Sequence, residues 1–296
     1  MTPNRTTLTL KKGTILARGR FEVIEPIAET SLNSVFKALD RNTGDLVAIK
    51  TPITIDDVSR KLFVQEGHIH KKIGDRNLFV PFVHLSSEPV NGSPVPYLVT
   101  GFVDAPTLAR VIAESSRRLS PRDSLRVALQ LIDASIYLGD LGYSQTDLKP
   151  GNLFLVDGAS IKMFDFGGVQ LVDPTKSEQI LPPNSVIATP DYMVPEYLTA
   201  KTFNGQVSVN HVIAIICAEL LTGQRLFVPK APIFDRRRYN SELIALKSKP
   251  VVFYPSDVPA PVRLLMDRTL SSDPTKRPQT FVEFGRQIQS CVSSLG

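Results

Sequence analysis

The stretch Asp147-Leu-Lys-Pro-Gly-Asn152, followed after one short hydrophobic hairpin by Asp165-Phe-Gly, decides how this sequence is interpreted. A phosphoryl group in transfer spreads negative charge over its oxygens, so a site that moves one works mainly by positioning and charge stabilisation. Asp147 would face the acceptor hydroxyl, and Lys149 would offset the charge that develops on the transferring group. Asn152 and Asp165 would hold Mg²⁺ through hard oxygen ligands. The order and spacing of these side chains therefore predict a phosphoryl-transfer site.

Five further strings along the chain support this interpretation. They are Val47-Ala-Ile-Lys50, Phe63-Val-Gln-Glu66, Thr189-Pro-Asp-Tyr-Met-Val-Pro-Glu196, Glu219-Leu-Leu-Thr-Gly223 and Asp273-Pro-Thr-Lys-Arg277-Pro278. Together they make the chain resemble the eukaryotic-like serine/threonine protein kinases of bacterial type, from about Gly13 to about Ser290. In that family the arginine matching Arg277 pairs with the glutamate matching Glu196 and braces the substrate loop.

The resemblance implies an α+β, bilobal fold of the protein kinase type. A small antiparallel β-sheet with one helix would form the N-lobe, and the larger C-lobe would be mainly helical. Residues 1–12 are expected to form an N-terminal tail and residues 13–296 the kinase domain. Within that domain the N-lobe would run from about 13 to 100, the hinge from about 101 to 104, and the C-lobe from about 105 to 296.

By the same resemblance, five side chains would form the catalytic set. Lys50 would reach the α- and β-phosphates and pair with Glu66, which the pattern places on a helix. Asp147 would act as the base or as the orienter of the acceptor hydroxyl, assisted by Lys149. Thr189 would hydrogen-bond both of these and, together with Lys149, indicates serine or threonine acceptors.

The resemblance also implies ATP as the nucleotide, bound with Mg²⁺ or with Mn²⁺. Val35 would cover the adenine, Thr100 would guard the back of its pocket, and Gly101 and Val103 would offer backbone groups to it. The residues expected to bind the nucleotide are Ile27, Val35, Ala48, Lys50, Thr100, Gly101, Val103, Asn152 and Asp165. Asn152 and Asp165 are the two expected to hold the metal.

The loop that should cradle the phosphates departs from the family pattern. The stretch Ile27 to Val35 carries Ala28, Thr30 and Asn33 where the family has three glycines. Glycine lets backbone N–H groups approach phosphates at no conformational cost. We therefore expect phosphate binding weakened by about one to two kcal/mol, or roughly tenfold in nucleotide affinity.

Two positions that would support the catalytic loop also differ from the family pattern. Gln145-Thr146 stands where the family has His-Arg, so a phosphorylated activation loop would lose its main docking arginine. Val209 replaces the aspartate of the family's F-helix, which accepts hydrogen bonds from the catalytic-loop backbone. That loss could leave buried N–H groups unpaired, at about 1–3 kcal/mol. The side-chain amide of Gln145 is the candidate replacement.

The remaining sequence predicts ordinary elements. Strands are expected at 21–27, 34–39, 46–50 and 96–103, and helices at 57–73, from 120 onward, and at 207–221, 260–270 and 280–294. Asp57 is expected to cap the first of these helices. The apolar faces of the first two would be formed by Leu62, Phe63, Ile69 and Ile73, and by Leu125, Leu129, Ile132 and Ile136. His70 is expected to pack toward Phe166. Residues 168–188 are expected to form a loop that carries Thr175, Ser177 and Ser185 as candidate phosphorylation sites.

Composition limits the function classes. The chain has 296 residues, 42% hydrophobic and 21% charged, which is ordinary for a globular domain. Its apolar runs fall short of the ~20 residues that a membrane span needs, and its first residues lack the apolar core of a secretory signal. The two cysteines, Cys217 and Cys291, give no disulfide framework. These features favour a cytoplasmic protein without a membrane span.

A net charge of +5 allows weak attraction to anionic partners. The densest basic run, Arg236-Arg237-Arg238, is too short for a nucleic-acid footprint, so no nucleic-acid partner is expected. A solvated face of the C-lobe is the simpler explanation of this run, and a preference for acidic substrates is the alternative.

Three functions are weighed. The leading hypothesis is an active serine/threonine protein kinase, because Lys50, Asp147 and Asp165 are all kept. The runner-up is a pseudokinase, a nucleotide-binding or scaffolding module whose C-lobe binds a partner. A small-molecule kinase of the aminoglycoside type is disfavoured by Lys149-Pro150 and by the string from Thr189 to Glu196. The motifs name no protein substrate, and they leave room for a regulatory protein partner.

Overall fold

The computed structural model describes residues 10–30, 32–53, 56–74, 76–90, 93–114, 118–171, 179–180, 189–200, 202–203, 205–250 and 252–295. The chain forms two compact units. Unit 1 comprises Met1–Asp104 together with Asp165–Gly167, and unit 2 comprises Ala105–Phe164 together with Gly168–Gly296.

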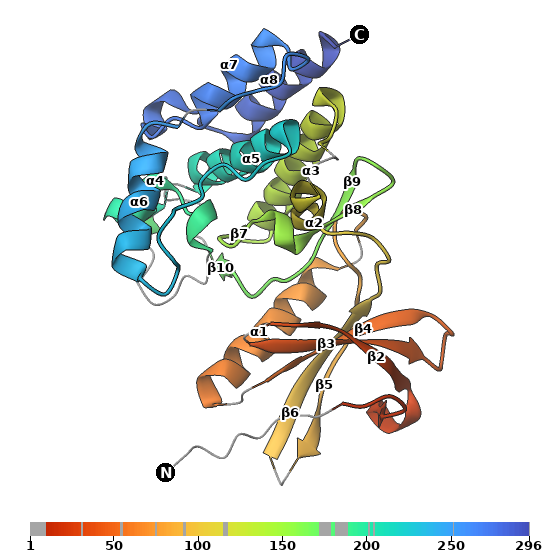
Figure 1. Cartoon of the computed structure of the whole chain (residues 1–296). Coiled ribbons are helices and arrows are strands. Elements are labelled where there is room, and N and C mark those ends of the chain that lie inside the picture. The colour runs from red at the N-terminus through yellow and green to blue at the C-terminus, as the bar shows by residue number, and fades with distance from the viewer. Residues whose placement is uncertain are drawn as a thin grey trace. The chain divides into compact units, whose positions relative to one another are not determined.

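Unit 1 contains an antiparallel sheet with strand order β1-β2-β3-β4-β6-β5 (Figure 1). The strands are β1 (Ile15–Leu16), β2 (Phe21–Glu29), β3 (Asn33–Asp40), β4 (Leu46–Pro52), β5 (Phe82–Val90) and β6 (Ser93–Gly101), and a 3₁₀ turn, η1 (Ala17–Gly19), joins the first two. Buried side chains alternate with more exposed ones at the start of β2 and along β3 and β4, as a half-buried sheet requires, whereas every side chain from Val95 to Val99 on β6 is buried. The resulting core includes Phe21, Val23, Phe36, Ala38, Val47, Ile49, Tyr97 and Val99.

The α-helix that the described residues of unit 1 form, α1 (Asp57–Ile73), packs against β4, β5 and β6. Its N-cap is Asp56, whose carboxylate accepts a hydrogen bond from Ser59 N at 2.7 Å, so the prediction that Asp57 caps the helix was wrong by one residue. Phe63 on the predicted apolar face is buried, but Leu62 is 47% exposed. The helix lies so close to the sheet that a Cβ on Gly67 would come within 2.6 Å of a Leu85 methyl group.

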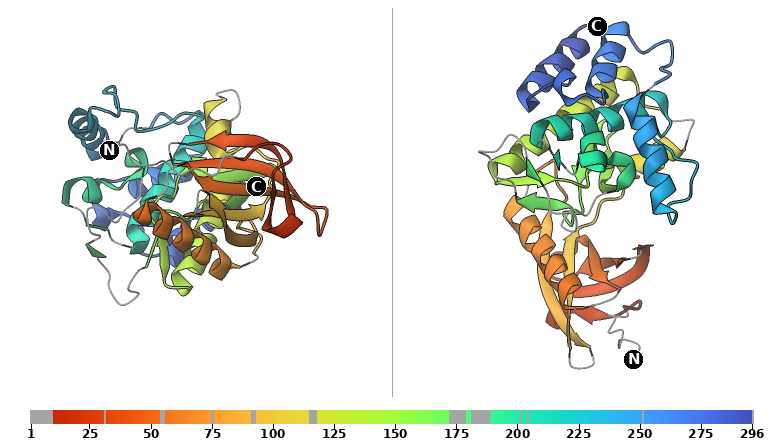
Figure 2. Two further views of the ribbon diagram at one scale, coloured as in Figure 1. Left: turned by 90° about the horizontal axis from the view of Figure 1, so that it is seen from below. Right: turned by 90° about the vertical axis from the view of Figure 1, so that its left-hand side faces the viewer.

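Unit 2 is mainly helical (Figures 1 and 2). Its helices are α2 (Leu108–Ala113), α3 (Pro121–Asp140), α4 (Pro195–Ala200), α5 (Gly205–Thr222), α6 (Arg236–Ser248), α7 (Ala260–Thr269) and α8 (Phe281–Ser293). Short 3₁₀ turns are η2 (Pro150–Asn152), η3 (Pro190–Tyr192) and η4 (Pro274–Lys276). The antiparallel sheet with one helix in unit 1 and the helical unit 2 confirm the predicted α+β class. Helix α6 was not predicted from the sequence.

The central helix of unit 2 is α5, which is buried along every residue from Val207 to Leu221. Among the described residues it is also the one helix that has the length and apolar composition to cross a membrane. Most of it is enclosed by other parts of unit 2, and the core helices of many globular domains meet the same criteria. Its composition is therefore weak evidence for a membrane span.

The longest helix, α3, begins as predicted. The Ser120 side chain accepts a hydrogen bond from Asp123 N at 3.1 Å, and Pro121 occupies the first helical position. The predicted apolar face was partly wrong, because Leu129 is only half-buried and Ile136 is 37% exposed. The buried side instead includes small residues such as Ala128, so apolarity alone misplaced the face.

Short strands position the loops of unit 2. The predicted hairpin after Asn152 is β8 (Leu153–Val156) with β9 (Ser160–Met163). The other pairs are β7 (Tyr143–Gln145) with β10 (Val169–Leu171), and β11 (Gln179–Ile180) with β12 (Thr202–Phe203). The prediction of an unbroken loop over 168–188 was therefore wrong at these strands. Thr175, Ser177 and Ser185 lie outside the described residues, as does most of the predicted N-terminal tail.

Candidate active site

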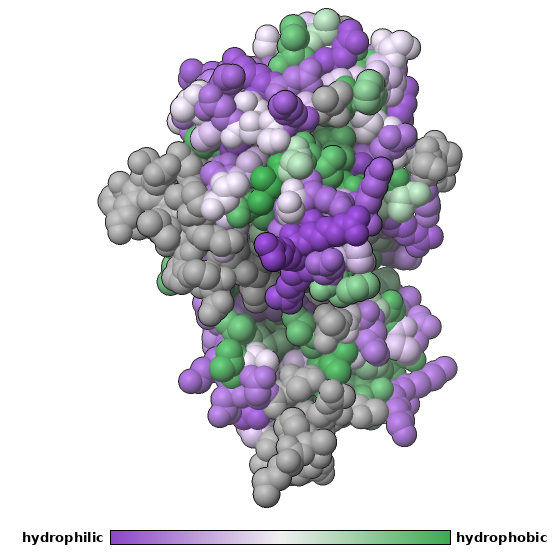
Figure 3. Space-filling model, turned by 60° about the vertical axis from the view of Figure 1, so that its left-hand side comes forward, coloured by the Kyte–Doolittle hydropathy of each residue, from purple (hydrophilic) through white to green (hydrophobic). Residues whose placement is uncertain are grey.

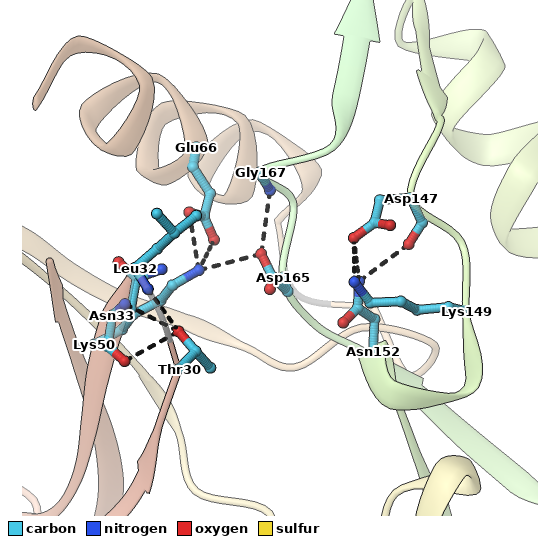
Figure 4. A network of polar contacts seen from close by, with 10 residues as sticks. All are labelled: Thr30, Leu32, Asn33, Lys50, Glu66, Asp147, Lys149, Asn152, Asp165 and Gly167. Carbon is cyan, nitrogen blue, oxygen red and sulfur yellow. Dashed lines mark hydrogen bonds and ion pairs between the residues drawn. The ribbon is translucent and has the colours of Figure 1, made fainter. Parts of the chain in front are cut away.

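Unit 1 brings Lys50, Glu66 and Asp165 together (Figure 4). Lys50 lies on β4, and its Nζ donates to the two Glu66 carboxylate oxygens at 2.7 and 3.0 Å and to Asp165 Oδ1 at 3.1 Å. Burial opposes the charge on Lys50, but the two carboxylates outweigh burial and raise its pKa above the ordinary value. Burial raises the pKa of Glu66, and the Lys50 ammonium opposes that rise. At 2.7 Å the pair is a charge-assisted contact, so Lys50 is held as a cation.

Asp165 is held in a strained backbone conformation. Its φ of +63° lies in the left-handed region, which a residue with a side chain rarely adopts. Its Oδ1 accepts from Gly167 N at 3.3 Å as well as from Lys50. Such strain persists only where neighbouring contacts fix it, and it is characteristic of functional sites.

The predicted packing of His70 on Phe166 is confirmed. The two ring centroids are 4.7 Å apart, and the His70 Nε2 lies 2.6 Å from the Val80 carbonyl oxygen. Phe166 is fully buried in unit 1 and also contacts Phe79. Burial lowers the pKa of His70, so the ring is neutral in this apolar setting. Phe166 is thereby anchored next to Asp165.

The residues predicted to bind adenine lie on neighbouring strands of the sheet. Val35 is opposite Lys50 in the β3–β4 ladder, and Ala48 is opposite Thr100 in the β4–β6 ladder. Ile27, on β2, is largely exposed.

Gly101 and Val103 are the two residues predicted to offer backbone groups to the adenine. The Gly101 N–H donates to Pro81 O at 2.9 Å, so the group that Gly101 can offer a ligand is its carbonyl oxygen. Val103 follows the last strand of the sheet, in the segment that ends unit 1.

The loop between β2 and β3 closes on the side chain of Thr30 (Figure 4). Its hydroxyl oxygen accepts hydrogen bonds from Leu32 N at 3.3 Å and from Asn33 N at 3.0 Å, and Thr30 N donates to Asn33 O at 2.8 Å. These are backbone N–H groups of the loop in which the family's glycines would present N–H groups to phosphates. Here the Thr30 hydroxyl oxygen accepts hydrogen bonds from two of these N–H groups.

Unit 2 brings Asp147, Lys149, Asn152 and Thr189 together. Lys149 Nζ donates to Asp147 Oδ2 at 2.5 Å and to the Thr189 hydroxyl at 2.8 Å. Asp147 Oδ1 accepts from Thr189 N at 2.8 Å and from the Thr189 hydroxyl at 2.9 Å. Asn152 Nδ2 donates to the Asp147 backbone oxygen at 3.0 Å. The Asp147 carboxylate is therefore buried and held by several donors at once.

The backbone of Asp147 is held by the neighbouring Gln145. The buried side-chain oxygen of Gln145 accepts a hydrogen bond from Asp147 N at 3.2 Å. Thr146 N and the Thr146 hydroxyl both donate to Gly168 O, at 3.0 and 2.7 Å. The catalytic loop is thus tied to the start of β10, and the Gln145 amide accepts the hydrogen bond for which the sequence analysis named it as a candidate.

Gly168 is a residue of this site that the sequence analysis missed. A Cβ at this position would lie 2.5 Å from Asp147 Cβ and 3.0 Å from Asp147 N. Only glycine allows the start of β10 to approach Asp147 this closely. The motif Asp165-Phe-Gly draws attention to Gly167, so the need for the next glycine appears only in the packing.

A buried ion pair braces the substrate-loop string Thr189 to Glu196. Arg277 binds Glu196 through two hydrogen bonds, of 2.8 and 3.0 Å, and its side chain is fully buried. Bidentate geometry is the strongest form of such a pair. Tyr192 in the same string donates to Glu219 Oε2 at 2.9 Å. The predicted pairing of Arg277 with Glu196 is therefore present.

Comparison with known proteins shows which family has this arrangement of residues. A model of the family described as "Protein kinase domain" matches residues 21–288. The chain belongs to the protein kinase domain family. A probable serine/threonine-protein kinase PknB of Bifidobacterium longum is 26% identical to it over 282 residues, covering 93% of this chain and 40% of that protein. CBL-interacting protein kinase 9 of Oryza sativa is 32% identical over 206 residues, covering 69% of this chain and 44% of that protein.

A third relative, a probable serine/threonine-protein kinase of Streptomyces coelicolor, is 24% identical over 277 residues, covering 93% of this chain and 40% of that protein. The chain thus spans less than half the length of these relatives. The predicted family is confirmed. Members of the protein kinase domain family generally use ATP and Mg²⁺.

Asn152 of unit 2 and Asp165 of unit 1 each suit a magnesium ion by the chemistry of their donors. Both offer hard oxygen atoms, and Mg²⁺ in kinases needs only one or two protein ligands beside phosphate and water. The hydrogen bonds from Asn152 to Asp147 use the amide nitrogen, which orients the side chain and leaves its oxygen for a ligand. Among the described residues no three His, Cys, Asp or Glu side chains gather as a separate metal site.

Proposed function

We propose that this kinase domain transfers the γ-phosphoryl group of ATP to serine or threonine hydroxyls of proteins. The observation that carries the proposal is the cluster of Asp147, Lys149 and Thr189, whose side chains hydrogen-bond one another at 2.5 to 2.9 Å. A carboxylate, an ammonium and a threonine hydroxyl are held there in one arrangement. The relatives whose names specify serine/threonine kinases support the same acceptor class.

The proposed reaction assigns a role to each of these groups. The acceptor oxygen bonds to the γ-phosphorus while the bond from that phosphorus to the β,γ-bridging oxygen breaks, and ADP leaves with the electron pair. Asp147 orients the acceptor hydroxyl and receives its proton. Lys149 offsets negative charge on the transferring group, and Thr189 holds both side chains in place. The Gln145 acceptor and the Gly168 contact fix the loop that carries Asp147.

Lys50 and Asp165 would hold the nucleotide. Lys50, kept cationic by Glu66, would bind the α- and β-phosphate oxygens, while Asp165 and Asn152 would hold the metal. Bound Mg²⁺, or Mn²⁺ in its place, neutralises negative charge on the phosphates. Weak phosphate binding is expected from the β2–β3 loop, because Thr30 occupies two of its N–H groups.

The pseudokinase alternative is not favoured. Lys50, Asp147 and Asp165 are present, and each makes hydrogen bonds with neighbours that would support catalysis. The altered positions, at Thr30, Gln145 and Thr146, concern the cradle and the loop support rather than the charged groups.

Transfer of labelled γ-phosphate tests the proposal. With Mg·ATP or Mn·ATP, the chain should label a generic protein mixture or itself, and mass spectrometry should place the phosphate on serine or threonine. Asp147→Ala and Asp165→Ala should lose this transfer by at least about a thousandfold, since each removes a charged group used in the transition state. Labelling by the wild type no greater than by these variants, at every metal concentration, would rule the enzyme out.

A further inference from the structure

The loop before α6 displays two large apolar side chains to solvent. Every residue from Pro232 to Arg238 is exposed, with Ile233 62% and Phe234 86% accessible. Single exposed apolar residues are common on proteins. Two adjacent large apolar side chains that are both mostly exposed indicate a surface on which something else packs.

This loop is held by hydrogen bonds, so the exposure belongs to a fixed structure. Glu242 Oε2 accepts from Lys230 N at 2.7 Å and from Ala231 N at 2.9 Å. Asp235 caps α6 by accepting from Arg238 N at 3.2 Å. The backbone on both sides of Ile233 and Phe234 is thus tied to α6.

The first turn of α6 carries charges of the unfavourable sign. A helix N-terminus has a partial positive charge, and cations there are destabilising. Yet Arg236, Arg237 and Arg238 fill this turn, which contains no acidic residue. Arg238 donates to Glu242 Oε1 at 3.1 Å, whereas Arg236 and Arg237 have no carboxylate partner within the described part of the chain. Local arrangements that work against stability mark functional surfaces.

The combination of side chains specifies the chemistry of an occupant. Two unpaired guanidinium groups match carboxylates, to which they can donate bidentate hydrogen bonds. The adjacent phenylalanine and isoleucine match an apolar side chain, and arginine with aromatic residues is the usual composition of binding hot spots. The side of the molecule on which α6 lies shows strongly hydrophilic side chains directly beside hydrophobic ones (Figure 3).

We propose that Ile233, Phe234, Arg236 and Arg237, the Ile233–Arg237 surface, form a docking site for an acidic and apolar segment of a partner protein. In that segment an aromatic or large aliphatic side chain is flanked by carboxylates. The surface is small, so the contact is transient. It uses none of the groups assigned to catalysis, and binding here is independent of phosphoryl transfer.

An anionic membrane would also attract arginine and phenylalanine. The carboxylates of Asp235 and Glu242 belong to the same loop and helix and would meet a continuous anionic surface. A short protein segment can avoid them, which favours the protein partner.

Selection from a random peptide library tests the proposal. A displayed library of dodecapeptides is selected on the full chain, and the enriched peptides are expected to carry carboxylates on both sides of a Phe, Leu, Ile or Met. The best peptide is then labelled, and its affinity is measured by fluorescence polarisation. Arg236→Glu with Arg237→Glu should weaken it at least tenfold, and Phe234→Ser at least fivefold. Asp147→Ala should bind it as the wild type does.

A matched pair on α7 provides the control. Arg263 is exposed and lies beside Leu264, which is 70% exposed, so Arg263→Glu with Leu264→Ser reverses an arginine charge and removes an exposed apolar side chain elsewhere in unit 2. This variant should keep the affinity within twofold. The proposal is overturned if no acidic and apolar peptides are enriched, or if the α6 variants bind them unchanged. It is also overturned if the α6 residues govern sedimentation with phosphatidylserine vesicles but not peptide binding.

Discussion

At the scale of single residues, Thr30 competes with the nucleotide for the loop between β2 and β3. Its hydroxyl accepts from Leu32 N and Asn33 N, which lie in the stretch where a phosphate-binding loop would present N–H groups. The weaker phosphate binding expected from the missing glycines thus has a second cause. Thr30, which stands in place of one glycine, also accepts hydrogen bonds from the N–H groups of its neighbours, so these N–H groups are already paired.

Replacing Thr30 should therefore strengthen nucleotide binding. Thr30→Val keeps the branched shape but removes the acceptor, which frees two N–H groups for phosphate oxygens. We expect Mg·ATP affinity to rise about three- to tenfold, the equivalent of roughly one hydrogen bond. Calorimetric titration measures the change. Thr30→Ser, which keeps the hydroxyl, is the control and should stay within twofold of the wild type. Equal affinities in the two variants would show that these N–H groups do not contact phosphate.

Gln145 is a second residue whose side chain hydrogen-bonds the backbone near the proposed site. The sequence places Val209 where an acceptor for the catalytic-loop backbone is expected, and a buried unpaired N–H would cost about 1–3 kcal/mol. The structure supplies the acceptor from Gln145, which lies two residues before Asp147 rather than on α5. The orientation of Asp147 therefore depends on a residue of its own loop.

Gln145→Met should lower kcat because it keeps the volume of the side chain and removes the acceptor for Asp147 N. We expect a loss of about ten- to thirtyfold in kcat, with KM for ATP within about twofold. The matched control is Gln130→Met, since Gln130 Oε1 accepts from Ile161 N at 3.0 Å in the same unit but away from Asp147. The control should lower the unfolding midpoint without lowering kcat. A similar loss of kcat in both variants would indicate a general effect on stability.

At the scale of elements, α6 carries a lysine that has no hydrogen-bonding partner in the described part of the chain. Lys247 is fully buried, and no described residue accepts a hydrogen bond from its Nζ, which lies 4.3 Å from the centroid of the Phe227 ring. Burial lowers the pKa of Lys247 to about 7, and repulsion by Arg277 acts in the same direction. The nearby carboxylates of Asp191, Glu219 and Glu196 attract the charged lysine and oppose this shift. Burial also raises the pKa of Glu219 to about 7.

This lysine predicts a dependence of stability on pH. In the unfolded chain Lys247 binds its proton below the ordinary lysine pKa of 10.5, whereas in the native state it binds the proton only near pH 7. Between these two pH values the unfolded chain holds one more proton than the native protein. The free energy of unfolding therefore falls as the pH is lowered from about 10.5 to about 7. The slope is about 1.4 kcal/mol per pH unit. Lys247→Met lacks this proton. Its stability relative to the wild type should therefore rise as the pH falls from about 10 to about 7, and then level off.

Urea unfolding of both proteins across this range measures the difference. Glu219 acts in the opposite sense between about pH 4.5 and 7, where the native carboxyl keeps a proton that the unfolded chain has lost and stability falls as the pH rises. Comparison at pH 7 and above isolates the lysine from that change. Lys249→Met, at an exposed position one residue beyond α6, is the control for the loss of a lysine side chain from this region. A constant difference between Lys247→Met and the wild type at every pH would mean that Lys247 is protonated in the native state.

At the scale of the whole molecule, the residues assigned to the proposed function are divided between the two units. Lys50, Glu66 and Asp165 belong to unit 1, and Asp147, Asn152 and Thr189 belong to unit 2. Nucleotide binding and phosphoryl transfer can therefore be separated by variants. A ligand bound only by the native state stabilises it by about 2.7 kcal/mol at a hundredfold excess over its Kd.

Thermal unfolding with Mg·ATP makes this separation measurable. Asp147→Ala should keep the ligand-induced rise in midpoint while losing transfer, because Asp147 is assigned to the acceptor and not to the phosphates. Lys50→Met should lose most of the rise, since a buried cation paired with Glu66 is removed. Lys71→Met, at an exposed position on α1, is the control and should keep it. An undiminished rise in Lys50→Met would place the nucleotide elsewhere.

Several elements could be predicted because their signals are local. The alternation along β2, β3 and β4, the Ser120 cap with Pro121, and the apolar run of α5 each act within a few neighbouring residues. Helix α6 was missed because its first turn holds three arginines, the reverse of the usual charge at a helix start. The face of α3 was misplaced because small buried residues such as Ala128 give no hydrophobic signal.

The sequence by itself determined the family, the fold class and the charged groups of the proposed site, because the motifs keep a fixed order and carry their own chemistry. Only the tertiary structure decided that Gly168 must lack a side chain beside Asp147 and that Gln145 accepts the Asp147 N–H. It also decided that Lys247 is buried with no hydrogen-bond acceptor among the described residues. These features depend on the close approach of side chains and backbone in the packed unit. Steric fit and the loss of water at such contacts follow from the fold, and local sequence patterns do not encode them.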